Sequence, residues 1–366
     1  MTQHVVVVGG GYGGTLVAKE LDSKADVTLI DPREGFVNAA ACLRALTRPE
    51  WAHHAFFRYD SLLVRGKVVR DRAISVDPAG VTLLSGNGID ADYLVLATGS
   101  SYAYPAKPND AAMTIAAQLA DLRSTHDELA SAERVLILGA GPVGIELAGE
   151  IKEVWSDKHV IIVDPGEKLL PGFLDEVRKE LLRQLDGLGV ELRLGTRLLT
   201  PPQLPPGRAG HFTVGANRGR PISADIWFKA YGVTANTDYL RNGQLTPLTR
   251  GLVPVTERLN VEGHDHVYAI GDIAALADPK MASYAMVHAQ VVADNITAQL
   301  SGQAPDAIHS TAEDRRILLP LGATAGVGQL PTPNGPGAAT VDTVIERKGR
   351  DLFTARFADR FGLPPA

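Results

Sequence analysis

The sequence holds one cysteine, Cys42, in 366 residues. A single cysteine excludes an internal disulfide, a redox pair of cysteines and a zinc site made of several cysteines. The chain also lacks an apolar run of the ~18 residues that a membrane-spanning helix needs. Neither an internal disulfide nor a helical membrane fold is therefore expected.

Targeting and nucleic-acid signals are missing as well. Residues 1–4 are too short and too polar for a signal peptide, and Thr2 stands where N-myristoylation requires glycine. Lys and Arg number 36 against 42 Asp and Glu, a net charge of −6, so no basic excess is available to neutralise phosphates. We expect a cytoplasmic protein that does not bind nucleic acid.

The start of the chain carries a dinucleotide-binding pattern. Residues 5–8 are four valines, which is typical of a strand buried on both faces of a parallel sheet. The turn after them consists of Gly9, Gly10, Gly11, Tyr12, Gly13 and Gly14. Its GxGxxG spacing allows a tight turn, a backbone close to a pyrophosphate and a helix packed on the strand. A second strand at 27–30 ends in Asp31, placed to bind an adenosine ribose.

A second copy of this unit begins at Arg134. The apolar residues 135–138 precede Gly139, Gly141 and Gly144 at the same spacing, and residues 160–163 end in Asp164. Two matches, each with its acid in place, are improbable by chance. The sequence therefore predicts two bound nucleotides.

Hydrophobic periodicity predicts the elements between and after the two units. Helices are expected at residues 36–46, 174–188, 281–300 and 351–361. Strands are expected at 67–76 paired with 80–84, and at 93–96, 190–194, 212–214, 226–231, 267–270, 317–321 and 338–345. Residues 93–96 lead into Ala97-Thr98-Gly99, residues 267–270 lead into Gly271-Asp272, and residues 100–108 read as a linker.

Together these motifs resemble the flavoproteins with two dinucleotide-binding domains, in which the first unit binds FAD and the second binds NAD(P)H. The resemblance narrows to the ferroptosis-suppressor branch of the apoptosis-inducing-factor-like NAD(P)H:quinone oxidoreductases. It covers essentially the whole chain, with matches in order at residues 36–44, 232–236, 261–272, 279–282, 288–289, 326–329 and 350–353.

The resemblance implies an α/β fold with two Rossmann-like dinucleotide-binding domains, of the pyridine nucleotide-disulfide oxidoreductase type, and a small C-terminal α+β segment. The FAD-binding domain is expected at residues 1–108 and 250–300, and the NAD(P)H-binding domain at 109–249. Residues 301–366 are expected to form an interface or lid segment.

The same resemblance implies the cofactor contacts. FAD is expected to meet the first glycine turn together with Asp31, Arg44, Ala73 (through its backbone), Thr98, Gly99 and Asp272. The nicotinamide nucleotide is expected to meet Gly139, Gly141, Gly144, Asp164 and Gly232. Asp164 is followed by Pro165-Gly166-Glu167 without an arginine, which favours NADH, with NADPH as the alternative.

Two residues are candidates for catalysis. Glu146 lies in the first helical turn after Gly144, where an acid favours the helix dipole by itself. In related flavoproteins a glutamate here faces the nicotinamide and flavin, so an orienting or proton-relay role is the second interpretation. Relatives that reduce quinones carry a basic residue after an aromatic in the final helix, and Arg360, after Phe357, is the approximate counterpart.

Other residues leave alternatives open. Cys42 lies in a stretch, 38–44, that reads as a helix core and lacks the Ser-Phe-Leu-Ser-Cys pattern of single-cysteine NADH peroxidases and coenzyme A disulfide reductases. A small buried hydrophobic residue is the favoured interpretation. Phe353, Phe357 and Phe361 recur every four residues, which indicates a core face or a membrane-surface or quinone-pocket face. The histidine pairs predict no metal site.

We therefore expect an FAD enzyme that takes hydride from NADH and passes electrons to a quinone-like small acceptor without a protein thiol. The alternatives are a reductase of a small ferredoxin-type carrier protein, a Cys42-dependent peroxidase or disulfide reductase, and a redox-sensing flavoprotein that does not turn over. A monomer or a homodimer is expected, and peripheral membrane contact is expected only through the C-terminal helix.

Overall fold

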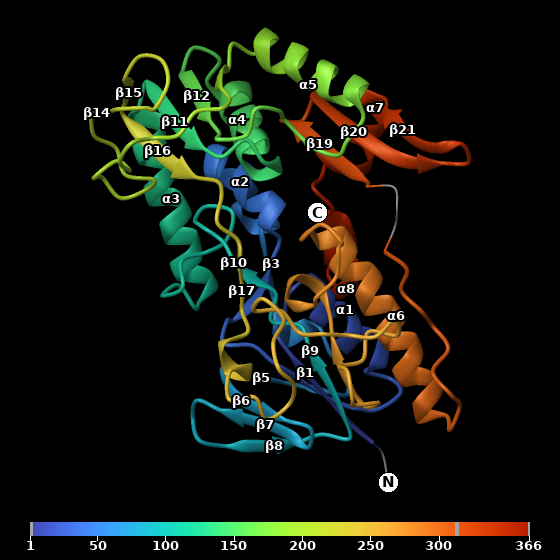
Figure 1. Cartoon of the computed structure of the whole chain (residues 1–366). Coiled ribbons are helices and arrows are strands. Elements are labelled where there is room, and N and C mark those ends of the chain that lie inside the picture. The colour runs from blue at the N-terminus through green and yellow to red at the C-terminus, as the bar shows by residue number, and fades with distance from the viewer. Residues whose placement is uncertain (1–2, 312–314, 365–366) are drawn as a thin grey trace.

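The computed structural model describes residues 3–311 and 315–364 (Figure 1). Its first sheet is parallel, in the order β18-β9-β1-β2-β5. The strands are β1 (His4–Val8), β2 (Asp26–Ile30), β5 (Lys67–Val69), β9 (Tyr93–Leu96) and β18 (Val267–Ala269). Every strand ends at the same edge, so the loops that follow β1, β9 and β18 lie together there.

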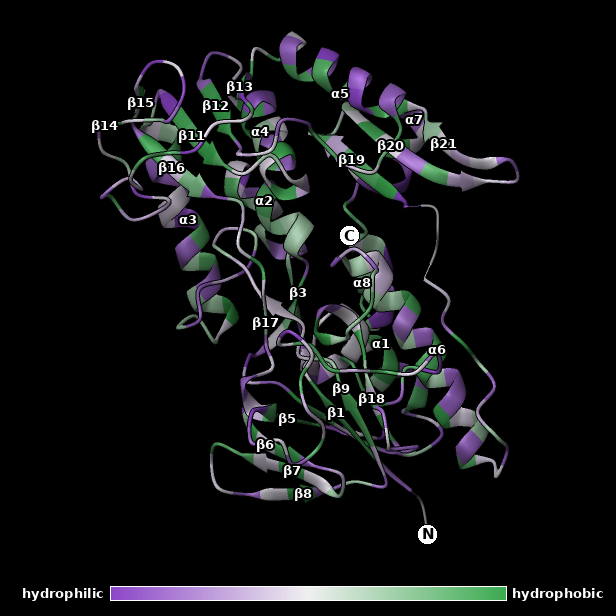
Figure 2. Ribbon diagram, viewed as in Figure 1, coloured by the Kyte–Doolittle hydropathy of each residue, from purple (hydrophilic) through white to green (hydrophobic). Residues whose placement is uncertain are grey.

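The side chains of β1 point alternately to the two faces of this sheet, and each face is covered by different elements. Val5 and Val7 face α1 (Tyr12–Leu21) and α6 (Ala282–Leu300), which pack against each other. Val6 and Val8 face the small antiparallel sheet of β6 (Ala73–Asp77), β7 (Gly80–Leu83) and β8 (Gly88–Asp90). Figure 2 shows apolar colours along the central strands of this sheet and mixed apolar and polar colours along α1 and α6.

The second sheet repeats the first with four parallel strands in the order β13-β12-β11-β16. They are β11 (Arg134–Leu138), β12 (His159–Val163), β13 (Glu191–Arg193) and β16 (Ile226–Lys229), with the hairpin of β14 (Phe212–Val214) and β15 (Ile222–Ala224) beside them. The helices are α3 (Ile115–Ser131), α4 (Pro142–Val154) and α5 (Asp175–Gly187). Two Rossmann-like units in one chain are thereby confirmed.

The two connections between the units run side by side. The first contains β10 (Ser100–Ser101) and the second contains β17 (Thr234–Ala235), and these strands pair antiparallel. The expected linker at 100–108 therefore includes a short strand. The domain boundaries at 108, 249 and 300 stay a prediction.

The C-terminal segment contacts both units. Its antiparallel sheet of β19 (Ile317–Leu321), β20 (Ala325–Thr332) and β21 (Gly335–Ala339) packs on α4 and α5. After α7 (Val341–Val344) and a π-helical turn, η5 (Ile345–Gly349), the chain crosses to the first unit and ends in α8 (Thr354–Arg360). Phe357 and Phe361, in and just after α8, are fully buried in the core of the first unit.

That burial supports the core interpretation of Phe357 and Phe361 over the membrane-surface alternative. Phe357 lies 4.9 Å, centroid to centroid, from Phe36, and Phe361 stacks on the same ring at 5.8 Å. These phenylalanines are core residues, so they do not form a membrane-facing stripe. None of the helices in the described part of the chain is long and apolar enough to cross a membrane.

Three predicted elements differ from the structure. The helix expected at 36–46 is strand β3 (Gly35–Val37), paired with β4 (Phe56–Arg58), followed by α2 (Ala39–Thr47). The single strand expected at 67–76 is two separate strands, because β5 belongs to the parallel sheet while β6 pairs with β7. The strand expected at 338–345 is wrong, since β21 ends at Ala339 and helical turns follow.

The remaining turns are short 3-10 helices. They are η1 (Pro49–His54), η2 (Tyr59–Ser61), η3 (Asp238–Leu240) and η4 (Gly271–Ile273). The last of these follows β18 directly and places Asp272 at the edge where the strands of the first sheet end.

Candidate functional site

The turn between β1 and α1 is shaped by glycine at two positions. Gly9 has a φ of 105°, a conformation that residues with a Cβ rarely adopt. A Cβ at Gly14 would overlap the carbonyl oxygen of Gly9, so only glycine lets α1 approach β1 this closely. The turn after β11 repeats both features at Gly139 and Gly144.

Each glycine turn is held by the acid at the end of the next strand. Asp31 accepts hydrogen bonds from the N–H groups of Gly10 (2.7 Å) and Arg33 (2.8 Å), and burial raises the pKa of its carboxyl group. Asp164 accepts from Ala140 (2.7 Å) and Gly166 (2.6 Å) in the second unit. The two GxGxxG units of the sequence therefore have the same hydrogen-bonded turn in the structure.

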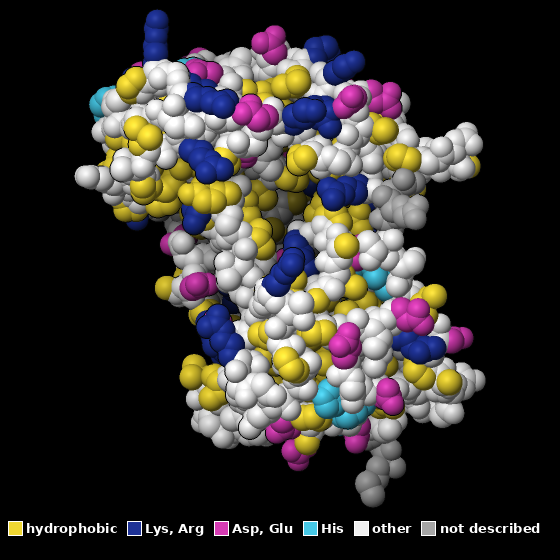
Figure 3. Space-filling model, in the orientation of Figure 1, with side chains coloured by type: hydrophobic (Ala, Val, Ile, Leu, Met, Phe, Trp, Pro, Cys, Tyr) yellow, Lys and Arg dark blue, Asp and Glu magenta, His cyan; other side chains and the backbone are white. Residues whose placement is uncertain are grey.

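A cavity of about 1530 Å³ opens beside the first glycine turn and continues between the two units and the C-terminal segment. Ligand sites commonly measure about 300–1,000 Å³, so this one has room for more than a single small molecule. Figure 3 shows hydrophobic side chains and Lys or Arg side chains around the hollow. Of the predicted residues, the cavity is lined by Gly9, Gly10, Gly11, Tyr12, Gly13, Asp31, Thr98, Gly99, Glu146 and Asp272.

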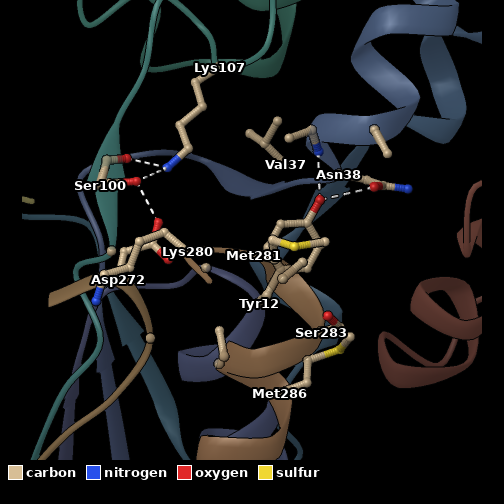
Figure 4. Close-up of a pocket in the computed structure, with 18 of the residues that line it drawn as sticks. Tyr12, Val37, Asn38, Ser100, Lys107, Asp272, Lys280, Met281, Ser283 and Met286 are labelled. Carbon is tan, nitrogen blue, oxygen red and sulfur yellow. Dashed lines mark hydrogen bonds between the residues drawn. The ribbon is translucent and has the colours of Figure 1, made fainter. Parts of the chain in front are cut away.

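One wall of the cavity is polar. The hydroxyl of Ser100 donates to Asp272 Oδ2 at 2.5 Å, and Lys107 Nζ donates to Ser100 Oγ at 3.1 Å and to the Ser100 carbonyl (Figure 4). Burial lowers the pKa of the Lys107 ammonium group. The sequence reasoning missed Lys107 because it lies in a stretch that reads as a linker.

The opposite wall is built around Tyr12. Its hydroxyl accepts the N–H of Ala39 at 2.8 Å and donates to Asn38 Oδ1 at 3.1 Å (Figure 4). Burial raises the pKa of this hydroxyl, so Tyr12 stays protonated at neutral pH. The remaining apolar lining includes Met281, Met286, Phe353 and Phe357.

Glu146 is paired with a lysine that the sequence did not single out. Lys348, on η5, donates to Glu146 Oε1 at 2.5 Å and to the Leu318 carbonyl at 3.1 Å. Burial raises the pKa of the Glu146 carboxyl group, and the Lys348 charge opposes that rise. The pair joins residues 202 positions apart, and the available signal was the basic pair at 347–348 just before the matched motif at 350–353.

Arg360, expected at the acceptor site, has another role. Its guanidinium donates to the Tyr12 carbonyl and to Thr15 Oγ1, each at 3.0 Å, and it is absent from the cavity wall. Burial lowers its pKa to about 10. Arg360 therefore ties α8 to the first turn of α1, and Lys348 is the cation beside Glu146.

Arg44 is also placed differently from the expectation. It is fully buried and forms a bidentate pair with Glu150 of α4, in which Nη2 donates to Oε1 at 2.8 Å and Nε donates to Oε2 at 3.1 Å. Its Nη1 donates to the Arg350 carbonyl at 3.2 Å. Arg44 therefore links α2 to α4 and to the C-terminal segment instead of lining the cavity.

The other predicted contacts lie outside the cavity wall. Ala73 begins β6, and Gly14 lies inside α1. The second-unit residues Gly139, Gly141, Gly144, Asp164 and Gly232 surround the loop ends of the second sheet and do not line this cavity. Their assignment to the nicotinamide nucleotide stays a prediction.

Cys42 is buried in α2, and burial raises the pKa of its thiol to about 12. A thiol with that pKa is fully protonated at neutral pH, whereas the reactive form is the thiolate. Cys42 is also absent from the cavity wall. Both observations argue against thiol chemistry.

Among the described residues, one cluster has the side chains of a metal site. Asp278 Oδ2 lies 3.3 Å from His288 Nε2 and 2.7 Å from His309 Nε2. The N–H of Gly271 donates to His288 Nδ1 at 3.1 Å, so the ring proton must sit on Nε2 and point at Asp278. His288 therefore has no lone pair left for a metal, and the cluster is a hydrogen-bonded support of the Gly271-Asp272 turn.

Comparison with known proteins agrees with this architecture. A family model described as pyridine nucleotide-disulphide oxidoreductase matches residues 3–293. Ferroptosis suppressor protein 1 of Homo sapiens is 30% identical over 367 residues, covering 96% of this chain and 94% of that protein. Apoptosis-inducing factor homolog B of Dictyostelium discoideum is 28% identical over 380 residues, covering 99% and 97%.

Solved structures share the fold at lower identity. The NAD-dependent persulfide reductase from A. fulgidus superposes with a TM-score of 0.70 and 19% identity, covering 91% of this chain and 65% of that one. The reduced CoADR-RHD of Bacillus anthracis also has a TM-score of 0.70, at 17% identity, covering 100% and 64%.

Proposed function

Because this chain belongs to the pyridine nucleotide-disulphide oxidoreductases, and within them to the family of ferroptosis suppressor protein 1 and the apoptosis-inducing factor homologues, we propose that it transfers electrons from NADH through FAD to a quinone-like acceptor. Membership makes the chain an oxidoreductase that uses FAD and NAD(P)H. The choice of NADH, the quinone and the residues that serve them are the proposal.

The residues of the first unit fit FAD. Helix α1 has Gly11 as its N-cap and no side chain bonded to its first N–H groups, and residues 11–13 line the cavity, where those groups suit a pyrophosphate. Asp31 and Asp272 both line this cavity, where their carboxylates suit ribose and ribityl hydroxyl groups as hydrogen-bond acceptors. When bound there, FAD supplies the hydride and electron chemistry.

The observation that carries the quinone proposal is the Glu146–Lys348 pair. Two of the three N–H groups of Lys348 have acceptors among the described residues, which leaves the third for a ligand in the cavity. A quinone gains two electrons and two protons on reduction, so a cation beside its oxygen stabilises the charge and donates a proton. Glu146 Oε1 holds the ammonium group in place.

NADH is proposed over NADPH because of the surroundings of Asp164. Gly166 donates to Asp164, and the next residue, Glu167, holds the nearby cation Arg218 at 3.0 Å. The 2′-phosphate of NADPH would meet two carboxylates and a cation that is already paired.

Stopped-flow mixing tests the proposal. The purified protein is expected to be yellow, its flavin is expected to bleach on mixing with NADH, and the colour is expected to return on mixing with 1,4-benzoquinone over many cycles. A protein that is reduced once and then stalls with every quinone is a sensor, and one that reoxidises only with a ferredoxin-type protein is a carrier reductase. Either result would overturn the quinone assignment.

A further inference from the structure

Asn38 is a buried N-cap residue whose side chain does not cap its helix. It precedes α2 as the N-cap, a position where an asparagine side chain normally accepts a helix N–H. Here it makes no such bond, although the residue is 0% exposed. Its backbone is already satisfied, since its N–H donates to Ala55 and its carbonyl accepts from Cys42.

The side chain instead joins two segments that lie more than 300 residues apart. Oδ1 accepts from the Tyr12 hydroxyl at 3.1 Å, and Nδ2 donates to the Leu352 carbonyl at 2.9 Å. The first partner is on the FAD side of the cavity wall, and the second precedes the final helix. Figure 4 shows Asn38 beside Tyr12 at this wall.

The segment that Asn38 holds has an unfavourable backbone. Leu352 and Phe353 are consecutive residues with φ of 51° and 63°, the left-handed region in which bulky side chains are rare. Residues in this conformation persist only where surrounding contacts enforce it. Asp351 accepts the Phe353 N–H at 3.0 Å, and Asn38 supplies the contact from outside the segment.

This turn sets the position of two groups on the cavity wall. Phe353 lines the cavity itself. The N–H of Leu352 donates to the Lys348 carbonyl at 2.7 Å, which fixes the turn one helical repeat after the lysine that pairs with Glu146. A shift of the Leu352 carbonyl therefore moves both the apolar wall and the cation.

We propose that Asn38 is a positioning residue for the acceptor site: by donating to the Leu352 carbonyl while accepting from Tyr12, it holds Phe353 and Lys348 where the electron acceptor docks. The inference rests on the proposed function for the identity of the acceptor. The effect of Asn38 on the turn is independent of the acceptor, and hydrogen exchange measures it separately.

Asn38→Asp separates the two hydrogen bonds. The new carboxylate, when ionised, still accepts from Tyr12 but cannot donate to the Leu352 carbonyl, whereas the protonated acid can do both. Burial raises the pKa of a carboxyl group, so the variant is expected to regain its donor as the pH falls from about 8 to about 6. Asn38→Ala lacks the donor at every pH.

The Asn38→Ala variant is also the control for pH effects that come from neighbouring titratable groups. Tyr12 and Cys42 stay protonated throughout this range, because burial raises the pKa of the Tyr12 hydroxyl well above its usual value and that of the Cys42 thiol to about 12. Glu146, which also lines the cavity, and its partner Lys348 are present in both variants. A pH effect found in Asn38→Asp alone therefore belongs to the new carboxyl group.

Asn295→Ala is the matched control for stability. Asn295 is also 0% exposed, and its Nδ2 also donates to distant carbonyls, those of Arg258 and Ala307. It does not line the cavity. Asn38→Ala and Asn295→Ala are expected to lose similar stability. Only the Asn38 variants are expected to change the acceptor site.

Three rates are measured on the FAD-loaded protein: reduction by NADH, reoxidation by 1,4-benzoquinone and reoxidation by ferricyanide, which accepts electrons without docking against a shaped wall. At about pH 8, Asn38→Asp and Asn38→Ala are expected to slow benzoquinone about tenfold, which corresponds to one hydrogen bond of ~1.4 kcal/mol. The other two rates are expected to stay within about twofold, because neither step depends on the position of Phe353 and Lys348. Lower pH is expected to restore Asn38→Asp alone.

Hydrogen exchange at residues 348–354 reports on the turn independently of any acceptor. Faster exchange in both Asn38 variants, with the rate pattern above, supports the proposal. If exchange is unchanged, or if all rates fall together as in a loosened fold, Asn38 is a packing residue and the proposal is wrong. If exchange quickens while the wild-type protein ignores benzoquinone, the proposed acceptor is wrong and the positioning of the turn stands.

Discussion

Replacing Lys348 by Met tests the chemistry of the site most directly. The change removes the partner of Glu146, whose side chain is 11% exposed, without shortening the apolar stem of residue 348. Breaking a buried ion pair by removing one member typically costs about 3–5 kcal/mol, because a charge is left without compensation. Glu146 can avoid that cost only by taking up a proton.

The sign of the resulting pH dependence follows from the Glu146 pKa. Burial already raises it, and the Lys348 charge is what holds it down. Without Lys348 the folded-state pKa rises further above the unfolded value, so the folded protein binds more protons than the unfolded one in the window between the two values. The variant is therefore expected to be most stable below the unfolded pKa of ~4.3 and to lose stability as the pH rises through that window, by at most ~1.4 kcal/mol per pH unit.

Urea unfolding at several pH values, followed by tryptophan fluorescence, measures this loss. Glu146→Gln in the Lys348→Met background is expected to recover much of the stability and to flatten the pH dependence, because position 146 then carries no unpaired carboxylate. Lys179→Met, an exposed change on α5, is the control and is expected to do neither. Reoxidation by 1,4-benzoquinone is expected to slow about 100-fold in Lys348→Met, the lower end of the range for general acids. A flat pH dependence together with an unchanged quinone rate would refute the assignment of this pair.

Three further changes test other parts of the site. Asp164→Ala is expected to weaken NADH about 10–100-fold, the loss of a charge-assisted hydrogen bond, and to leave NADPH less affected; equal kcat/KM for both nucleotides in the unmodified enzyme would contradict the NADH preference. Cys42→Ser is expected to leave NADH:quinone turnover nearly intact, because the thiol is buried and protonated; loss of turnover with FAD still bound would restore the thiol mechanism. Phe361→Ala is expected to cost about 3–5 kcal/mol, since the ring is fully buried, and to leave vesicle sedimentation unchanged; a loss of vesicle binding without a loss of stability would show a membrane face.

The parts of the site that the sequence predicted are those set by local chemistry. The two glycine turns and their acids follow from sterics and hydrogen bonding within about thirty residues. Asp31 and Asp164 were expected to bind ribose, which stays a prediction, and the bonds that each donor in the glycine turn makes to them were not foreseen. The Gly271-Asp272 turn was found in the same way, because a strand ends just before it.

What the sequence did not predict depends on long-range packing. Lys348 meets Glu146 only because the C-terminal segment folds back between the units, and no periodicity encodes that return. Arg44 was assigned to the cofactor by resemblance, yet its place is set by Glu150 on a helix 106 residues away. The strand expected at 338–345 failed for a related reason: apolar residues there serve a short helix and a π-helical turn, whose pattern over so few residues is hard to tell from a strand.

The order of strands in the first sheet has a consequence for synthesis of the chain. Strand β9 ends at Leu96, but its outer neighbour, β18, begins only at Val267, with the whole second sheet between them. At about 5–20 residues per second, a ribosome needs roughly 10–35 s to make the intervening stretch. During that time the second sheet can close while β9 is still an unpaired edge, the kind of strand that recruits other chains. The later unit in the sequence can thus be completed first, while the β9 edge stays open until β18 has been made.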